Sequence, residues 1–345
     1  MSDAAPREEP ASAGIKDVAA LAGVSIATVS NALNHRERVA APTLDRIDRA
    51  IGMLGYIPNG AARSLAAGRT RSFGLVLSDL GNSLFVDIAR GAERAADERG
   101  LSIVLANSDG ELEREDRYVE LFAETRVRGV LLTLNDASHF RAIVGRHAHG
   151  QPLVMLNLHD DSGRYCTASI DNEAGGHLAT AHLLETGRRR IVFVGGPDSL
   201  QPVDDRRRGF RRALAQAGLT PVDEVSPTWV NRADGWQVGR ALAERVRAGE
   251  VDGIVAASDL LAAGIVQALS EHGAIPVPDQ VGVIGYDNNQ AAWDAPIPIS
   301  TISQPGEELG FVGAHLLIDE VEQPGHEHRA IRLNPELIVR RSTER

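Results

Sequence analysis

Two short amphipathic segments joined by a tight turn follow the polar start of the chain. Their apolar residues are spaced so that two helices would share one buried face. Gly23 suits the sharp reversal between them, and Ser25 is a good N-cap, whose hydroxyl accepts a backbone N–H of the next helix. This pattern predicts a helix-turn-helix. The apolar positions are Val18, Ala19, Ala22, Val24, Val29 and Leu33.

A third helix and a short, marginal one are predicted next. Apolar residues from Leu44 to Leu54 recur every three or four positions after Pro42, which suits the first turn of a helix. The pattern breaks at 56–59, and residues 60–67 are then good helix formers that Gly68 ends. A helix this short is unstable alone, so we expect it to form only when it packs against something.

From residue 72 short apolar runs alternate with amphipathic segments. Each run predicts a buried strand, and helices between the strands imply parallel sheets covered on both faces. We expect about nine or ten strands, which fits two doubly wound lobes better than one very wide sheet. The strand candidates are 72–77, 101–106, 130–133, 153–156, 191–194, 253–256 and 281–284, with a helix over 85–99.

The charge is divided unevenly along the chain. The net charge is -11, yet residues 15–71 carry eight basic and four acidic side chains, so this part has a balance of +4 and the remainder -15. Attraction to phosphate falls off over about 8 to 10 Å at moderate salt. The local balance therefore permits the first part to bind DNA.

Composition excludes several other classes. No apolar run approaches the roughly 20 residues of a membrane span, and the start has no hydrophobic signal core, so a cytoplasmic protein is expected. Cys166 is the single cysteine, which rules out an intramolecular disulfide framework and disfavours a thiolate metal cluster. No nucleophile elbow, phosphate loop, dinucleotide motif or zinc-type spacing occurs, so neither an enzyme, a cofactor nor a metal is predicted. The histidines of two probable turns, which show no metal spacing, are His147, His149, His326 and His328.

Particular runs carry a resemblance to a known family. The first three are D-V-A-x-x-A-G-V-S-x-x-T-V-S (Asp17 to Ser30), L-G-Y-I-P-N (Leu54 to Asn59) and A-R-S-L (Ala62 to Leu65). Together they form a long match without gaps, and they resemble the lactose-repressor and galactose-repressor (LacI/GalR) family of bacterial transcription regulators. The rest of the chain resembles the effector core of that family, through motifs at 74–79, 171–176, 182–191, 258–264 and 284–288.

The resemblance implies an N-terminal all-α helix-turn-helix domain and an α/β two-lobed, periplasmic-binding-protein-like core with two doubly wound parallel sheets. The expected parts are a disordered lead-in (1–13), the DNA-binding domain (14–58), the hinge helix and linker (59–71) and the effector-binding and dimerisation core (72–345). Within the core, an N-lobe is expected over about 72–170 and 301–330, and a C-lobe over about 171–300 and 331–345.

In the family the second helix enters the major groove, and base reading falls here on Ile26, Ala27 and Asn31. Asn31 can pair with adenine or donate to guanine, whereas the other two offer only apolar contact, for instance to a thymine methyl. The side chains assigned to phosphate contacts, which set the register, are Ser25, Thr28, Ser30 and Asn34. For Ser25 and Thr28, capping the helix is an equally good role.

The hinge contacts fall on Asn59, Ala62 and Leu65. In the family the leucine wedges into the minor groove and kinks the operator. The alternative is a leucine that packs a linker helix on the core. One departure is Ala40, which stands where the family commonly has a capping serine before the third helix.

Ligands of open α/β sheets bind beyond the carboxyl ends of the strands, so the effector is expected between the lobes. The polar side chains expected there suit hydroxyl groups and favour a carbohydrate-like effector. Trp229 is the candidate aromatic platform for a sugar ring, with Phe85 and Trp293 as alternatives that are more often core residues. Asp171 and Asn172 either contact ligand or cap the next helix, and Ser258 replaces the usual asparagine of the family. The polar candidates are Asp79, Asn82, Asn107, Asp109, Thr133, Asn157, Arg206, Asp259, Asp287 and Gln304.

The expected protein is thus a transcription regulator, and the resemblance to the family favours a repressor. Its expected partners are a near-palindromic double-stranded operator, a small effector and a second copy of the chain. It would be found on the nucleoid when bound to DNA, without a membrane partner. The direction of effector control is left open. The alternative is a solute-binding protein with the same core.

Overall fold

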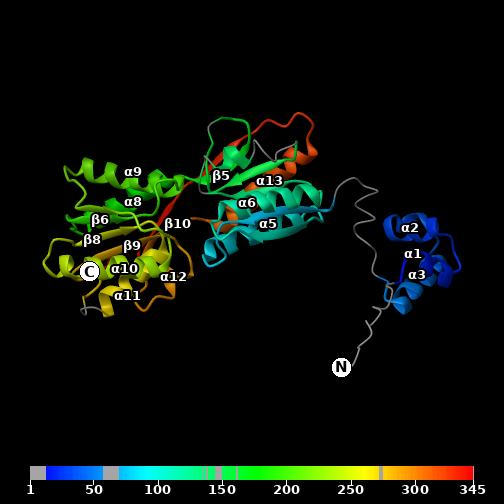
Figure 1. Ribbon diagram of the computed structural model, residues 1–345, viewed down its shortest axis with the longest axis horizontal. Coiled ribbons are helices and arrows are strands. Elements are labelled where there is room, and N and C mark those ends of the chain that lie inside the picture. Colours follow the sequence, from blue (N-terminus) through cyan, green and yellow to red (C-terminus); the bar gives the residue numbers. More distant parts are fainter. Residues whose placement is uncertain are drawn as a thin grey trace, which may run out of the picture. The chain divides into compact units, whose positions relative to one another are not determined.

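The computed structural model describes residues 13–56, 70–134, 136, 139–143, 150–160, 162–271 and 275–344. The chain forms two compact units, Met1–Thr70 and Arg71–Arg345, which we call the head and the core. Helices and strands of both units are labelled in Figure 1. Among the described residues, no helix combines the length and the apolar character that crossing a membrane requires.

The head is a small helical domain built as the hydrophobic pattern predicts. Gly23 closes the first helix in the left-handed conformation (φ 63°), which glycine adopts without strain. The third helix has Ala40 at its N-cap position, which supplies no side-chain hydrogen bond, and a proline in its first turn. The head elements are α1 (Ile15–Ala22), α2 (Ile26–Asn34), the 3-10 turn η1 (Arg36–Arg38) and α3 (Ala41–Leu54).

A single apolar cluster holds these helices together. Val18, Val29 and Ile47, one from each helix, are fully buried at its centre. Every apolar position that the sequence predicts for this domain lies in the cluster or packs against it. The cluster is small, so the head has little stability to lose. Its buried members are Val18, Ala19, Ala22, Val29, Ala32, Ile47, Ala50 and Tyr56.

Two six-stranded sheets make up the core within the described residues. All strand pairs are parallel except β10 with β12. The first sheet has the order β11 (Ala330–Leu333), β5 (Cys166–Ile170), β4 (Leu153–Leu156), β3 (Val130–Thr133), β1 (Ser72–Leu77), β2 (Ser102–Asn107). The second has the order β12 (Glu336–Ile338), β10 (Ser300–Ser303), β9 (Gly282–Asp287), β8 (Gly253–Ala256), β6 (Ile191–Val194), β7 (Asp223–Val225).

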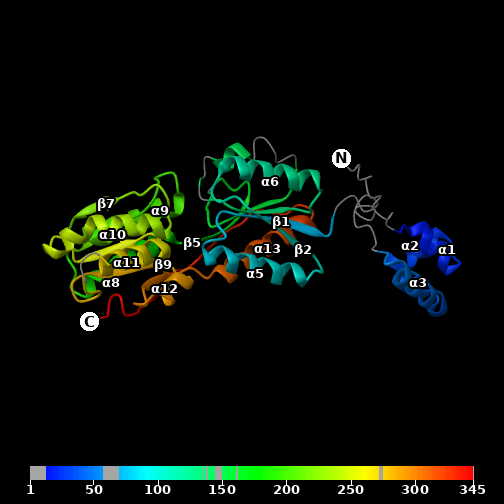
Figure 2. The same ribbon diagram turned by 60° about the horizontal axis from the view of Figure 1, so that its bottom comes forward.

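Helices cover both faces of each sheet (Figures 1 and 2). In the first lobe, alternate residues of β1 point to opposite faces, so Leu75 packs in the cluster beneath α5 and α13 while Val76 packs in the cluster beneath α6. In the second lobe, α8 pairs with α9, and α10 with α11. The core helices are α5 (Ser83–Asp97), α6 (Leu112–Glu124), α8 (Asn172–Glu185), α9 (Gln201–Gln216), α10 (Arg232–Arg247), α11 (Asp259–Glu271), α12 (Gln290–Trp293) and α13 (Gly306–Glu322).

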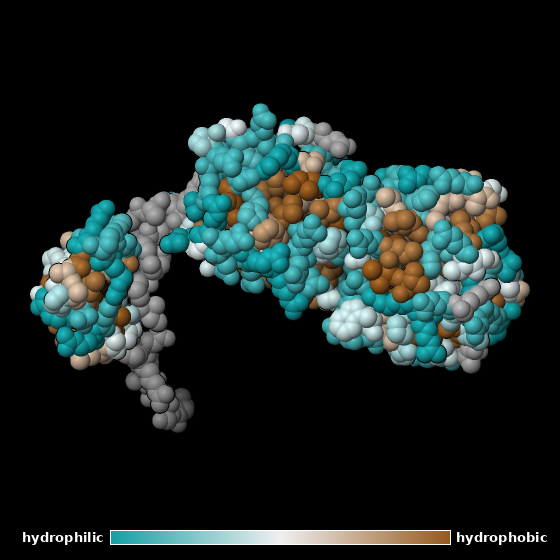
Figure 3. Space-filling view, turned by 180° about the vertical axis from the view of Figure 1, so that it is seen from behind, coloured by the Kyte–Doolittle hydropathy of each residue, from teal (hydrophilic) through white to brown (hydrophobic). Residues whose placement is uncertain are grey.

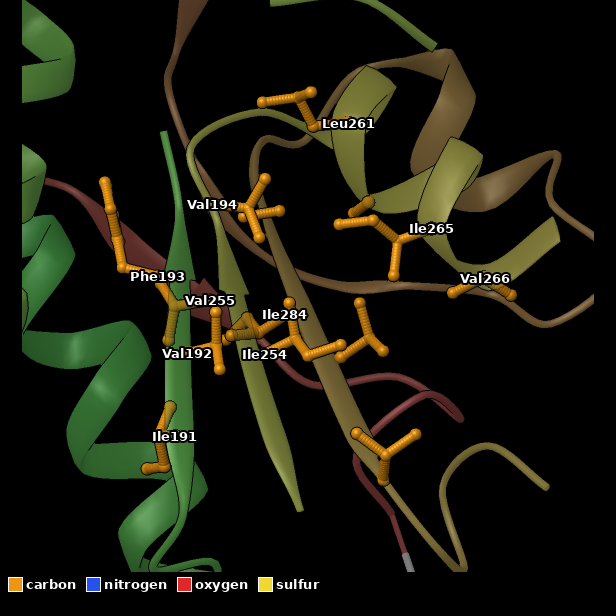
Figure 4. Packing of buried hydrophobic residues seen from close by; sticks show 14 of the residues in the cluster. Ile191, Val192, Phe193, Val194, Ile254, Val255, Leu261, Ile265, Val266 and Ile284 are labelled. Atoms are coloured by element: carbon orange, nitrogen blue, oxygen red, sulfur yellow. The ribbon is translucent and has the colours of Figure 1, made fainter. Parts of the chain in front are cut away.

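The C-lobe holds the largest single apolar cluster of the described residues (Figure 4). Ile191 to Val194 on β6 and their neighbours on β8 and β9 pack against Leu261 and Ile265 of α11. These strands read as unbroken apolar runs because both of their faces are covered. The surface is mostly hydrophilic, but hydrophobic patches interrupt it on both lobes (Figure 3).

The chain passes between lobes slightly later than the sequence suggests. Strand β10 lies in the second sheet, although residues from 301 onward were expected in the N-lobe, and β11 lies in the first, although residues from 331 onward were expected in the C-lobe. Both crossings therefore follow the strand, after residues 303 and 333. The reason is physical: a strand completes its ladder before the chain leaves the sheet.

Candidate functional site: a recognition helix and an interlobe cleft

The outer surface of α2 presents the residues expected to read DNA. Ile26, Ala27 and Asn31 are exposed, and Ile26 retains 45% of its accessible surface although it is a large apolar side chain. Val29 and Ala32 on the opposite side anchor the helix in the head. The helix therefore offers one amide and two apolar side chains to a partner, which is a surface suited to thymine methyl groups and one base-edge hydrogen bond.

Ser25 and Thr28 act together at the start of this helix. The hydroxyl of Ser25 accepts the backbone N–H of Thr28 (3.1 Å), and the two hydroxyl oxygens lie 2.8 Å apart. Asn34 instead turns its amide back to the carbonyl of Ser30 (3.0 Å). The structure thus shows the capping role for Ser25, whereas the hydroxyl of Thr28 contacts the capping hydroxyl rather than a backbone N–H. The hinge candidates Asn59, Ala62 and Leu65 lie outside the described residues.

A cleft of about 530 Å³ lies where the carboxyl ends of the two sheets face each other. Ser78 and Asp79 follow β1, Asn157 follows β4, Asp287 ends β9 and Gln304 follows β10. Parallel strands present their carboxyl ends at one edge, so residues from distant parts of the chain converge here. This volume fits a small-molecule ligand.

Asp287 is the centre of the polar network in this cleft. One carboxylate oxygen accepts from the amide of Asn82, which belongs to the other lobe (3.1 Å), and the other accepts from Gln304 (2.6 Å). Its backbone has φ 111°, a conformation that non-glycine residues rarely adopt and that is common where strain serves function. Burial raises the pKa of Asp287, and the nearby guanidinium of Arg206 opposes this.

Arg206 lies on α9, and its guanidinium group contacts several neighbouring residues. Its Nε donates to Asn172 (2.8 Å), its Nη1 donates to the carbonyl of Ala257 (2.5 Å), and the guanidinium stacks over the ring of Tyr286 (3.7 Å to the centroid). The distance from Nη1 to Asp287 is 3.8 Å. Gly176 of α8 makes room for this arrangement, since a Cβ there would lie 2.1 Å from the carbonyl oxygen of Arg206.

Hydrogen bonds also join the two lobes beside the cleft. Asn289 donates to Asn82 (2.9 Å), and the backbone N–H of Gln290 donates to Ser83 (3.1 Å). Both acceptors lie at the start of α5. These two bonds connect the C-lobe to the N-lobe beside the cleft lining.

Most of the effector candidates from the sequence line the cleft. Trp229 is half exposed at 56%, whereas Phe85 is buried at 6%, so they offer different amounts of apolar surface. Trp293 does not line the cleft. Asp171 caps α8 by accepting the N–H of Ala174 (2.9 Å), in agreement with one of the two roles considered. The candidates that line the cleft are Asp79, Asn82, Phe85, Asp109, Asn157, Arg206, Trp229, Asp287 and Gln304.

The structure places Asn107, Thr133 and Asp259 outside the cleft lining. The amide of Asn107 donates to Asp109 (2.5 Å), and the hydroxyl of Thr133 bonds to the neighbouring strand β1. Asp259 is fully buried and accepts from Thr301 (2.6 Å) and the N–H of Asn289 (2.8 Å); burial raises the pKa of this carboxyl well above its usual value. These three side chains therefore organise the loops behind the cleft.

Sequence reasoning missed part of the lining. Asp136 is a polar residue near a strand end and could have been chosen by the same rule as the others, whereas Ser258 was noted only as a departure from the family. The apolar residues gave no signal, because nothing in their type distinguishes a cleft wall from a core. The missed residues are Ser78, Leu84, Gly110, Leu112, Asp136, Pro197, Ser199, Leu200, Pro202, Val203, Thr228, Val230, Asn231 and Ser258.

Two family descriptions match the chain. Residues 14–59 match "Bacterial regulatory proteins, lacI family", and residues 180–343 match "Periplasmic binding protein-like domain". The HTH-type transcriptional repressor PurR of Vibrio parahaemolyticus is 32% identical over 337 residues, covering 96% of this chain and 99% of that protein. The repressor of the same name from Aliivibrio fischeri ES114 is 31% identical, with 96% and 98% covered.

Solved structures agree with these matches. A transcriptional regulator CelR–cellobiose complex has 33% identity and a TM-score of 0.70, and covers 96% of this chain and 99% of its own. The lac repressor dimer bound to operator and the anti-inducer ONPF has 25% identity and a TM-score of 0.84, with 96% and 99% covered. On the evidence of its head, its two-lobed core and these relatives, the chain belongs to the lacI family of bacterial regulatory proteins and is a DNA-binding transcriptional repressor.

Proposed function

We propose that this repressor binds a neutral sugar or sugar derivative in the interlobe cleft, and that the bound sugar sets its affinity for a near-palindromic operator. The observation that carries the proposal is the lining of the cleft, where hydrogen-bonding side chains from both lobes surround Asp287. Carboxylates and amides together accept and donate, which matches hydroxyl groups that do both.

The charges of the cleft favour an uncharged ligand over a phosphorylated one. Asp79, Asp109, Asp136 and Asp287 line it, and among the described lining residues Arg206 is the one cationic side chain. The guanidinium of Arg206 lies 3.8 Å from the carboxylate of Asp287, so its positive charge is already partly offset within the cleft. A phosphate would therefore meet excess negative charge.

Apolar residues supply the other requirement of sugar binding. Phe85, Leu200, Val230 and the half-exposed Trp229 present carbon surface in the same cleft. The C–H groups on the face of a sugar ring pack against such apolar surface, while the hydroxyl groups around its edge form hydrogen bonds.

Two structural relatives were solved with sugars. They are CelR with cellobiose, and a LacI-type regulator of Alkaliphilus metalliredigens (26% identity, TM-score 0.71, 80% and 100% covered) with D-xylulofuranose.

We further infer that the operator is read by a homodimer. One head presents one recognition helix, so two copies related by a two-fold axis would read the two halves of a palindrome. Strand β2 is the edge of its sheet, and its Val104 and Leu105 are 45% and 43% exposed, an apolar edge that a second copy could cover. The solved lac repressor relative is a dimer on its operator.

A ligand screen tests the effector class directly. Differential scanning fluorimetry of the full chain would use cellobiose, other neutral mono- and disaccharides, their phosphates and planar nucleobases, since a ligand bound to the native state raises its melting temperature. We expect stabilisation by at least one neutral sugar. Stabilisation confined to phosphates or nucleobases would contradict the sugar assignment.

Paired variants on one helix then test the site. Arg206→Ala should abolish the stabilisation by the active sugar, because it removes the group that holds Asp287 and Asn172. Arg211→Ala is the matched control, since Arg211 lies on the same helix but pairs with Glu224 at the exposed surface. Equal responses of both variants would place the sugar elsewhere.

A further inference from the structure

Four side chains with metal-ligand chemistry converge at the edge of the N-lobe. Cys166 begins β5, Glu320 lies near the end of α13, and His326 and His328 lie on the loop that leads into β11. One ligand atom from each residue lies within 4.8 Å of all the others. The cysteine is separated by about 160 positions from the histidines in the chain, so no spacing motif reveals the cluster.

The distances within the cluster resemble those of a tetrahedral zinc site. Cys166 Sγ lies 3.1 Å from His326 Nε2 and 3.8 Å from His328 Nδ1. Around an ion with bonds of about 2.3 Å to sulfur and 2.0 Å to nitrogen, tetrahedral geometry puts sulfur and nitrogen about 3.5 Å apart. The two observed distances bracket this value.

Glu320 gives an independent sign that a cation is accommodated here. Its Oε2 is buried without a hydrogen-bond partner among the described residues. The backbone N–H of Leu153 contacts the same carboxyl group, but a carboxylate oxygen left without a partner away from water is costly. A bound cation would satisfy this oxygen.

One contact of Cys166 also suits a metal-bound sulfur. The backbone N–H of Arg329 points at Cys166 Sγ at 3.4 Å, the kind of outer hydrogen bond that orients and stabilises a metal-bound sulfur. The guanidinium of Arg329 is held by Asp319 (2.5 Å). A surface cavity lined by residues 320–326 and His328 gives an ion a path to the cluster.

We propose that Cys166, Glu320, His326 and His328 form a binding site for a divalent transition metal of the zinc class. A set of one sulfur, two imidazole nitrogens and one carboxylate favours such an ion over Mg²⁺ or Ca²⁺, which prefer oxygen alone. The ion would tie the loop between α13 and β11 to the start of β5.

The site is separate from the effector cleft. Cys166 lies at the amino end of β5, whereas the cleft lies beyond the carboxyl ends, about 13 Å further along this five-residue strand. The proposal therefore does not depend on the identity of the effector.

Cobalt titration of the full-length, untagged, reduced and metal-free chain tests the proposal. Co²⁺ substitutes for Zn²⁺ and absorbs in the near ultraviolet when a thiolate binds it. We expect one equivalent to bind with this absorption, which Zn²⁺ then displaces. Binding of much less than one equivalent, or binding without the thiolate absorption, would overturn the proposal.

Variants assign the ligands. Cys166→Ser should abolish the absorption, and His328→Gln should weaken cobalt binding at least tenfold; the latter residue is exposed, so its replacement spares the fold. His315→Gln is the control, because His315 lies on α13 beside Glu98, away from the cluster, and should bind cobalt as the parent does. Parent-like titration of His328→Gln, or unchanged absorption in folded Cys166→Ser, would refute the assignment.

Discussion

The head and the core present their functional groups in opposite ways. The surface that we expect to read DNA comes from one helix of the head, and Ile26, Ala27 and Asn31 are neighbours in the sequence. The lining of the cleft extends from Ser78 to Gln304 and exists only because the strands of two sheets end at the same place. A local surface depends on one small apolar cluster, whereas a convergent one depends on a whole topology. Substitutions should therefore separate the two activities.

The largest expected effect is loss of the head. Ile47→Ala removes a fully buried side chain from a cluster of eight buried residues, at a cost of about 2 to 5 kcal/mol. For so small a domain this approaches the total stability. Operator affinity, measured by fluorescence anisotropy, should fall more than 100-fold, while the thermal transition of the core stays unchanged.

Met53→Ala is the control for this substitution. Met53 lies on the same helix but is 76% exposed, so its truncation should change operator affinity less than twofold. A shift of the core transition in Ile47→Ala would show that the two units are not independent.

The reciprocal substitution is Asp287→Ala in the core. It removes the acceptor of two amide donors and leaves Arg206 without its nearby carboxylate, so sugar affinity should fall at least 100-fold, about 3 kcal/mol. Calorimetric titration measures this. Asp279→Ala, at an exposed position, should bind sugar as the parent does. Retained sugar binding in Asp287→Ala would remove this residue from the site.

A smaller effect is expected from Asn31→Ala. Loss of one base-edge pair should weaken operator binding about 10- to 100-fold, because a good bidentate pair discriminates by about 1 to 3 kcal/mol. Affinity for unrelated DNA should not change, and neither should sugar binding. Equal weakening on both kinds of DNA would mean that Asn31 contacts the backbone.

The smallest effect is expected from Ser25→Ala. Removing the cap should cost about 1 kcal/mol of head stability, since the N–H of Thr28 loses its acceptor. Amide hydrogen exchange in α2 should then be about fivefold faster. Ser30→Ala, within the helix, is the control. Unchanged exchange in Ser25→Ala would show that Thr28 alone suffices at this helix start.

The same contrast explains what the sequence could predict. The head was predictable in detail because its helices follow from local spacing, down to Gly23 and Ser25. In the core, long apolar runs such as Ile191–Val194 predicted strands correctly, but the count of about nine or ten was too low, since twelve are present in the described part. The strands absent from the predicted set are short or polar, as in β10 (S-T-I-S) and the edge strand β12 (E-L-I).

The cleft was predictable only by the rule that polar residues at strand ends meet. That rule found Asp287 and Gln304, but it cannot tell a side chain that faces the cleft from one that folds back, as Thr133 and Asp259 do. The choice depends on side-chain rotamers and on neighbours far away in the sequence. The Cys166 cluster shows the same limit, because its residues meet only through the pairing of β5 with β11.

The central claim is that a sugar bound in the cleft changes the affinity of the head for its operator. The direct measurement is the dissociation constant for an operator duplex, selected from random DNA, with and without the neutral sugar that stabilises the core. Linkage requires the two ligands to affect each other equally. We predict a change of at least fivefold in the parent and none in Asp287→Ala. A sugar that stabilises the core yet leaves the operator affinity of the parent unchanged would contradict the account.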